Sequence, residues 1–257
     1  MKRILWSCAL AGAVFATAAQ AAGNAGYDLS TGVYTDYVYR GTLRAQTSLL
    51  SEATATWKTT RTLSLNARVV NATVLSTNPL PGKVGPGTSG LLEDRYDLSA
   101  RYKPFKNVGF TAGWMYYDWN KARPVAPDTA EVYGGIETNW CGWHPSAYVF
   151  YDYSKQIGLY TAATVARSFA VGKTGWSLDT FGAIGFDFGN RSGNAPKING
   201  LRNGLVSFDM NYTLTKGVEF GPRVDIDFPA RRALDPNDGP EHIRVVPGLG
   251  FNCNGTF

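Results

Sequence analysis

The chain has 257 residues, of which 13% are aromatic and only 18% are charged, and its formal net charge is +5. This modest charge, without a basic run interleaved with aromatics, argues against a nucleic-acid-binding protein. The sequence has three cysteines and two histidines, and none of them has metal-site spacing. We therefore expect neither a metal ion nor another cofactor.

The N-terminus has the three parts of a secretory signal peptide. Basic residues at positions 2 and 3 precede an apolar stretch at 4–19, and Ala19-Gln20-Ala21 is a small-x-small cleavage sequence. An uncleaved N-terminal anchor is a weaker alternative, because the apolar stretch is short and diluted with Ala, Gly and Thr. We expect residues 1–21 to be removed and residues 22–257 to form a single exported domain.

Beyond the N-terminus the dominant pattern is an alternation of apolar and polar side chains in segments of about ten residues. In 205–214, for example, the even positions are apolar and the odd positions after Leu205 are polar. Successive side chains of a strand point to opposite faces, so one face of each segment is apolar and the other is polar. In chain order the pattern predicts strands at 27–40, 47–58, 62–74, 92–103, 108–119, 129–140, 146–155, 159–169, 176–188, 204–215, 218–228 and 242–252.

The connections between these segments alternate between short and mostly longer ones. Outer-membrane barrels have this rhythm, with short periplasmic turns, longer external loops and an even number of strands. The sequence therefore predicts an all-β fold, a transmembrane antiparallel up-and-down β-barrel of about 12 strands. The external loops are predicted at 41–46, 75–91, 120–128, 156–158, 189–203 and 229–241.

A soluble β-sandwich also has alternating strands and is the main alternative fold. Its core would be largely aliphatic. Here aromatic residues, among them Trp57, Trp114, Trp140 and Trp176, lie toward the ends of the apolar faces, where the interfacial belts of a membrane barrel belong.

With the polar faces directed inward, the barrel interior holds more acidic than basic side chains. Charged walls in a low-dielectric frame focus the field, and rings of carboxylates favour the passage of cations. The alternative is that these charges pair with one another and close the lumen. The pore-lining candidates are Asp36, Arg40, Arg68, Arg95, Asp97, Arg101, Glu131, Glu137, Asp152, Asp179, Asp187, Asp209, Arg223, Asp225 and Asp227.

No constellation of catalytic residues is evident. His144 and His242 lack a Ser or Cys partner on the same face of a strand, so we expect no enzymatic activity. After cleavage the remaining cysteines are Cys141 and Cys253. In an oxidising compartment they can form a disulfide or remain as two thiols, and the sequence leaves both alternatives open.

The string Thr35-Asp36-Tyr37-Val38-Tyr39-Arg40-Gly41, in an early strand soon after the signal peptide, resembles the TorF-type putative porins. The likeness is confined to these seven residues, together with overall length and repeated strands. It implies a small bacterial outer-membrane β-barrel.

The function expected from the sequence is a porin-like channel in the bacterial outer membrane. It would contact outer-membrane lipid and let small hydrophilic solutes diffuse passively, with a preference for cations. The alternative is a plugged structural or adhesive barrel whose external loops bind a partner.

Overall fold

The computed structural model describes residues 24–40, 42–75, 90–118, 128–154, 157–190, 198–229 and 243–256. The predicted signal peptide, residues 1–21, lies outside this part of the chain. Within it, no helix is long and apolar enough to cross a membrane.

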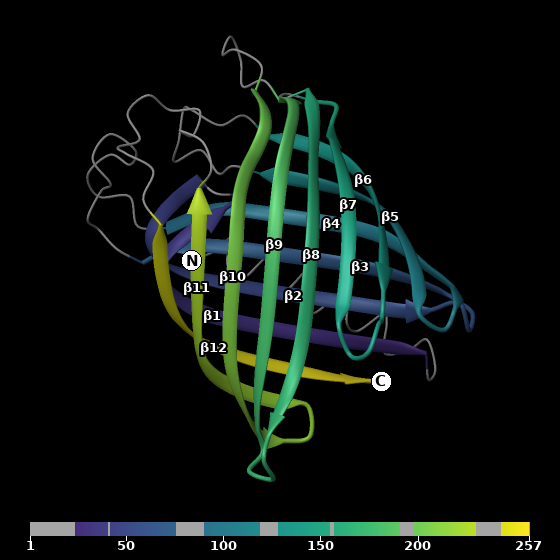
Figure 1. Cartoon of the computed structure of the whole chain (residues 1–257), viewed down its shortest axis with the longest axis vertical. Coiled ribbons are helices and arrows are strands. Elements are labelled where there is room, and N and C mark those ends of the chain that lie inside the picture. Colours follow the sequence, from purple (N-terminus) through teal and green to yellow (C-terminus); the bar gives the residue numbers. More distant parts are fainter. Residues whose placement is uncertain are drawn as a thin grey trace.

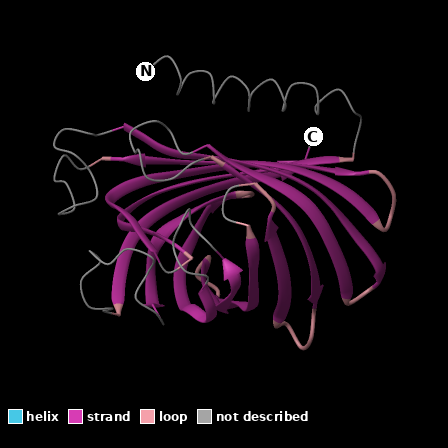
Figure 2. Cartoon of the chain, turned by 90° about the horizontal axis from the view of Figure 1, so that it is seen from above, coloured by secondary structure: helices cyan, strands magenta, loops and turns pink. Residues whose placement is uncertain are grey.

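The described residues form one closed antiparallel barrel in which each strand pairs with its neighbours in sequence and β1 pairs with β12. Figure 1 shows the strands, and Figure 2 shows that they curve into one continuous wall. The strands are β1 (Ala25–Tyr39), β2 (Thr42–Lys58), β3 (Leu63–Val74), β4 (Gly90–Phe105), β5 (Val108–Asp118), β6 (Thr129–Thr138), β7 (His144–Asp152), β8 (Gly158–Val171), β9 (Trp176–Asn190), β10 (Ile198–Thr215), β11 (Val218–Pro229) and β12 (Arg244–Thr256).

The predicted number, direction and order of the strands are confirmed. Because the strands are antiparallel, the β2–β3, β4–β5, β6–β7, β8–β9 and β10–β11 connections lie at one end of the barrel, together with the start of β1 and the end of β12. We call this end the turn end. The opposite end, where β1 meets β2, is called the loop end.

Three predicted boundaries differ from those of the structure by four residues or more. The stretch 41–46 was expected to be a loop, but β2 begins at Thr42 because a register irregularity after Tyr37 keeps both strands paired. Similarly, β10 begins at Ile198 and carries two irregularities of its own. At the C-terminus β12 continues to Thr256, beyond the predicted end of the last strand at residue 252. Bulges interrupt the simple alternation from which the boundaries were predicted.

The two faces of the wall have opposite character. Large apolar side chains on the outer face are exposed, with Leu98 at 56% and Leu249 at 59%, whereas Glu93, Asp187 and Asp227 on the inner face are nearly inaccessible. A soluble protein buries its apolar side chains, so this inverted arrangement requires an apolar environment around the barrel. It excludes the β-sandwich alternative.

Aromatic side chains gather toward both ends of the outer face. Near the loop end Trp114 stacks on Tyr116 and donates a hydrogen bond from Nε1 to the hydroxyl of Tyr153 at 2.8 Å. Near the turn end, the ring centroids of Trp176 and Tyr212 are 5.0 Å apart. Two such bands match the interfacial belts of a membrane barrel.

On the inner face, tyrosine rings lie flat over glycines. A Cβ atom at Gly113 would lie 2.5 Å from Cζ of Tyr133, whose hydroxyl donates to Asp97 at 2.8 Å. The glycine therefore makes room for a ring that a hydrogen bond holds in place.

We expect Gly113→Val to destabilise the barrel by about 1–3 kcal/mol, because the new side chain must displace an anchored ring. The matched control is Gly134→Val in the adjacent strand, where a Cβ would meet only a main-chain oxygen at 3.7 Å. Urea unfolding followed by tryptophan fluorescence in lipid vesicles measures both. Equal stability of the two variants would contradict this account of the tyrosine.

Candidate functional site

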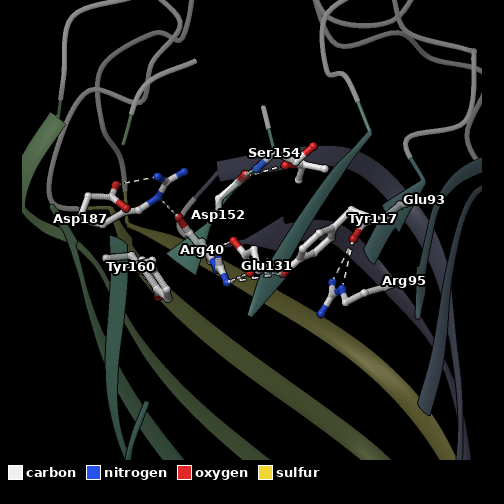
Figure 3. A network of polar contacts seen from close by, with 12 residues as sticks. Arg40, Glu93, Arg95, Tyr117, Glu131, Asp152, Ser154, Tyr160 and Asp187 are labelled. Atoms are coloured by element: carbon white, nitrogen blue, oxygen red, sulfur yellow. Dashed lines mark hydrogen bonds and ion pairs between the residues drawn. The ribbon is translucent and has the colours of Figure 1, made fainter. Parts of the chain in front are cut away.

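An arginine crosses the loop end of the barrel interior. Arg40 follows β1 with a φ of 48°, and its guanidinium donates to both carboxylate oxygens of Glu131 on β6, at 2.7 and 2.8 Å. In the ring of strands, β6 is separated from β1 and β2 by β3, β4 and β5. An arginine side chain is too short to cross that span from the wall, so Arg40, at the tip of the β1–β2 hairpin, must lie over the mouth, and Figure 3 shows its side chain in contact with Glu131.

Aromatic rings surround the same guanidinium. Its central carbon lies 4.2 Å from the ring centroid of Tyr160 on β8 and 4.9 Å from that of Phe150 on β7. The hydroxyl of Tyr117 donates to Glu131 at 2.9 Å. Cation–π contacts and a bidentate ion pair are both strongest where water is scarce, and here the two charged side chains are only 14% and 5% exposed.

A second arginine holds the main chain of the hairpin. Arg202 on β10 donates from Nε to the carbonyl oxygen of Arg40 at 2.8 Å and forms an ion pair with Asp187 on β9 at 2.6 Å. The side chain of Arg40 thus fixes the hairpin tip to β6. The carbonyl of Arg40 fixes it to Arg202 on β10, which is itself held by Asp187 on β9. We call Arg40, Glu131, Arg202 and Asp187 the mouth clasp.

Further carboxylates surround the mouth clasp. Asp152 accepts hydrogen bonds from the Thr129 hydroxyl at 2.6 Å and from the Ser154 amide at 2.9 Å. Asp227 is 2% exposed, and its Oδ2 has no hydrogen-bond partner among the described residues. The mouth is therefore both acidic and narrow.

Below the mouth the barrel interior contains a half-open chamber of about 660 Å³ that is lined by polar, charged and apolar side chains. It lies against β1 to β4 and β9 to β12, and the glycines Gly32, Gly221 and Gly250 are among the residues that line it. The charged side chains that line it are Glu52, Arg68, Arg95, Asp179, Asp209, Glu219 and Arg223.

The ion pairs around the chamber run along its wall rather than across it. Arg68 pairs with Glu52 of the adjacent strand at 2.7 Å. Arg223 pairs with Asp225 of its own strand at 2.8 Å and with Asp209 of the adjacent strand at 3.4 Å. Pairs between neighbouring residues neutralise charge without filling the bore. The Arg40–Glu131 pair of the mouth clasp instead joins the β1–β2 hairpin to β6 on the far side of the ring.

The predicted candidates fall into three levels of the interior. The side chain of Asp36 lies outside the described part of the structure. The remaining candidates all have inward-facing side chains: Arg40, Glu131, Asp152, Asp187 and Asp227 near the mouth, Arg68, Arg95, Asp97, Asp179, Asp209, Arg223 and Asp225 around the chamber, and the Arg101–Glu137 ion pair near the turn end.

Sequence reasoning missed two parts of this site. Arg202 was assigned to an external loop, but the irregularity between Leu201 and Asn203 brings it to Asp187. The aromatic neighbours of Arg40 were also missed. Alternation within β7 and β8 gives no sign that Arg40 reaches Phe150 and Tyr160.

The disulfide that the sequence left open is not formed. Cys141 and Cys253 are both free thiols. Cys141 lies in the β6–β7 turn and Cys253 lies in β12, on the opposite side of the ring, so the barrel itself keeps the two sulfur atoms apart.

No protein-family model matches the chain, and no curated protein does. Solved structures of other proteins have folds similar to that of this chain. The COG4313 outer membrane channel from Pseudomonas putida F1 has a TM-score of 0.54 and 12% identity, over 90% of this chain and 95% of that chain. The NanC porin has a TM-score of 0.53 and 6% identity, over 88% of this chain and 98% of that chain. Likeness at such low identity concerns the fold alone, and it confirms the predicted transmembrane antiparallel up-and-down β-barrel.

Proposed function

We propose that this protein is a porin-like channel of the bacterial outer membrane through which small hydrophilic solutes diffuse passively. The observation that carries the proposal is the chamber of about 660 Å³ inside the barrel, whose ion pairs run along the wall. The similar structures named as an outer membrane channel and a porin support it. Residues 1–21 would direct export as a cleaved signal peptide.

Preference for cations is the second part of the proposal. Carboxylates outnumber guanidinium groups on the inner face of the described strands, and an acidic interior within an apolar wall concentrates cations. The inward carboxylates are Asp28, Glu52, Glu93, Asp97, Glu131, Glu137, Asp152, Asp179, Asp187, Asp209, Glu219, Asp225 and Asp227, against the cations Lys58, Arg40, Arg68, Arg95, Arg101, Arg202, Arg223 and Arg244.

Membership of the TorF-type putative porins is also a proposal, supported by residues 35–41 alone. A non-enzymatic role is proposed because the chamber combines no histidine with a nucleophile: His144 lies at the turn end of β7, and His242 lies outside the described residues.

The alternative, a plugged barrel with a structural or adhesive role, is favoured by one observation, the mouth clasp across the bore. Liposome swelling separates the two functions. Vesicles that contain the folded protein should swell in solutions of small sugars and amino acids, and swelling should slow as solute size increases. Verified folded protein that leaves the vesicles impermeable would favour the plugged barrel.

We expect the double variant Asp179→Asn, Asp209→Asn to lower the cation preference, because it removes two carboxylates that line the chamber. Reversal potentials across a salt gradient in a planar bilayer measure the preference. Asp128→Asn is the control, since Asp128 lies outside the bore, where it accepts a hydrogen bond from the outward-facing Tyr116. An unchanged reversal potential in the double variant would show that these carboxylates do not control the ion path.

A further inference from the structure

A single arginine interrupts the apolar outer face near the turn end. Arg167 on β8 pairs with Thr180, and both lie on the outward side, because the flanking pair of Ala166 and Phe181 faces inward. The outward neighbours of Arg167 on its own strand are Val165 and Phe169, both exposed. A cation on the lipid-facing side of a membrane barrel needs a partner at the membrane surface.

Arg167 lies at a point on β8 that is close to the membrane surface. Its neighbour Ala166 pairs with His144, the first residue of β7, so Arg167 lies beside the β6–β7 turn. That turn carries Trp140, which is 71% exposed, and Trp143. Arg167 therefore lies within the aromatic band of the turn end, at the level of lipid headgroups rather than acyl chains.

Two aromatic rings hold the guanidinium in one orientation. Its central carbon lies 5.0 Å from the ring centroid of Trp143 and 4.8 Å from that of Phe169, and the two rings meet edge to face at 84°. Among the described residues, none forms an ion pair or a hydrogen bond with the guanidinium of Arg167, whereas its main-chain oxygen accepts a hydrogen bond from the Thr180 hydroxyl at 3.1 Å. The arginine is thus preorganised while its N–H donors are free.

We propose that Arg167, flanked by Trp143 and Phe169, binds the phosphate of an anionic glycerophospholipid in the membrane leaflet at the turn end. A guanidinium presents a planar fork of donors that matches two phosphate oxygens, and the aromatic rings suit the boundary between headgroup and acyl chain. The proposal rests on the membrane location of the barrel. It does not depend on whether the barrel conducts.

Native mass spectrometry of the detergent-solubilised protein tests the site with phosphatidylglycerol. The wild-type protein should retain one more bound lipid molecule than Arg167→Gln, and the variant should bind about tenfold more weakly, because charge-assisted hydrogen bonds are lost. Arg167→Lys keeps the charge without the fork and should bind with intermediate affinity. The heat-dependent gel shift of a folded barrel verifies each variant.

Two controls make the result specific. Arg61→Gln removes a charge from the exposed β2–β3 turn at the same end and should leave lipid retention unchanged. Diacylglycerol, which lacks phosphate, should not be retained. Equal retention by Arg167→Gln and the wild type, or an equal loss in Arg61→Gln, would overturn the proposal. Displacement of the lipid by inorganic phosphate alone would also overturn it and assign the site to the free anion.

Discussion

Replacing Arg40 with alanine should raise the single-channel conductance at least about twofold, because it removes the group that spans the mouth of the bore. The guanidinium forms the bidentate pair with Glu131 and lies over Tyr160. Without it, the hydrogen bond from Arg202 to the carbonyl oxygen of residue 40 still holds the main chain of the hairpin tip. The Glu131 carboxylate remains at the mouth, so the channel should also become more selective for cations.

The matched control is Arg101→Ala. Arg101 also pairs with a carboxylate from another strand, Glu137, but this pair lies near the turn end and away from the hairpin. We expect its conductance to stay close to that of the wild type. Equal conductance of Arg40→Ala and the wild type, for protein verified as folded, would show that the mouth clasp is not the narrowest point.

Replacing Glu131 with alanine should have the largest effect on stability. It leaves the Arg40 guanidinium, 14% exposed, without its carboxylate. Removing one partner of a buried ion pair costs about 3–5 kcal/mol, since the remaining charge stays desolvated. Urea unfolding in lipid vesicles measures the loss, and a change below about 1 kcal/mol would indicate a solvated pair.

The selectivity of these two variants should change in opposite directions. Arg40→Ala leaves a carboxylate at the mouth, whereas Glu131→Ala leaves a guanidinium. The first should increase the cation preference and the second should lower it, and the double variant should lie between them. A shift in the same direction for both single variants would mean that the mouth charges do not set selectivity.

The architecture could be predicted from the sequence because alternation repeats in every strand. In β11, for example, Phe220, Val224 and Phe228 face outward while Arg223 and Asp227 face inward, and the structure has this arrangement. Whether a side chain in a regular strand points inward or outward depends only on whether its position is odd or even along that strand. The inward direction of most candidate residues followed from that rule.

The mouth clasp could not be predicted in this way. The contact between Arg40 and Glu131 joins residues far apart in sequence, and it depends on the curvature of the closed sheet and on a hairpin tip folded over the mouth. The role of Arg202 depends on a bulge. The alternation of apolar and polar residues within one segment shows neither how the barrel closes nor where a bulge lies.

Single-channel recording of the refolded protein in a planar bilayer, across a gradient of potassium chloride, tests most directly whether ions pass through the chamber. We predict a steady conductance with a reversal potential of the sign that cation preference requires. A barrel that is folded by its gel shift and yet silent in the bilayer would contradict the channel function.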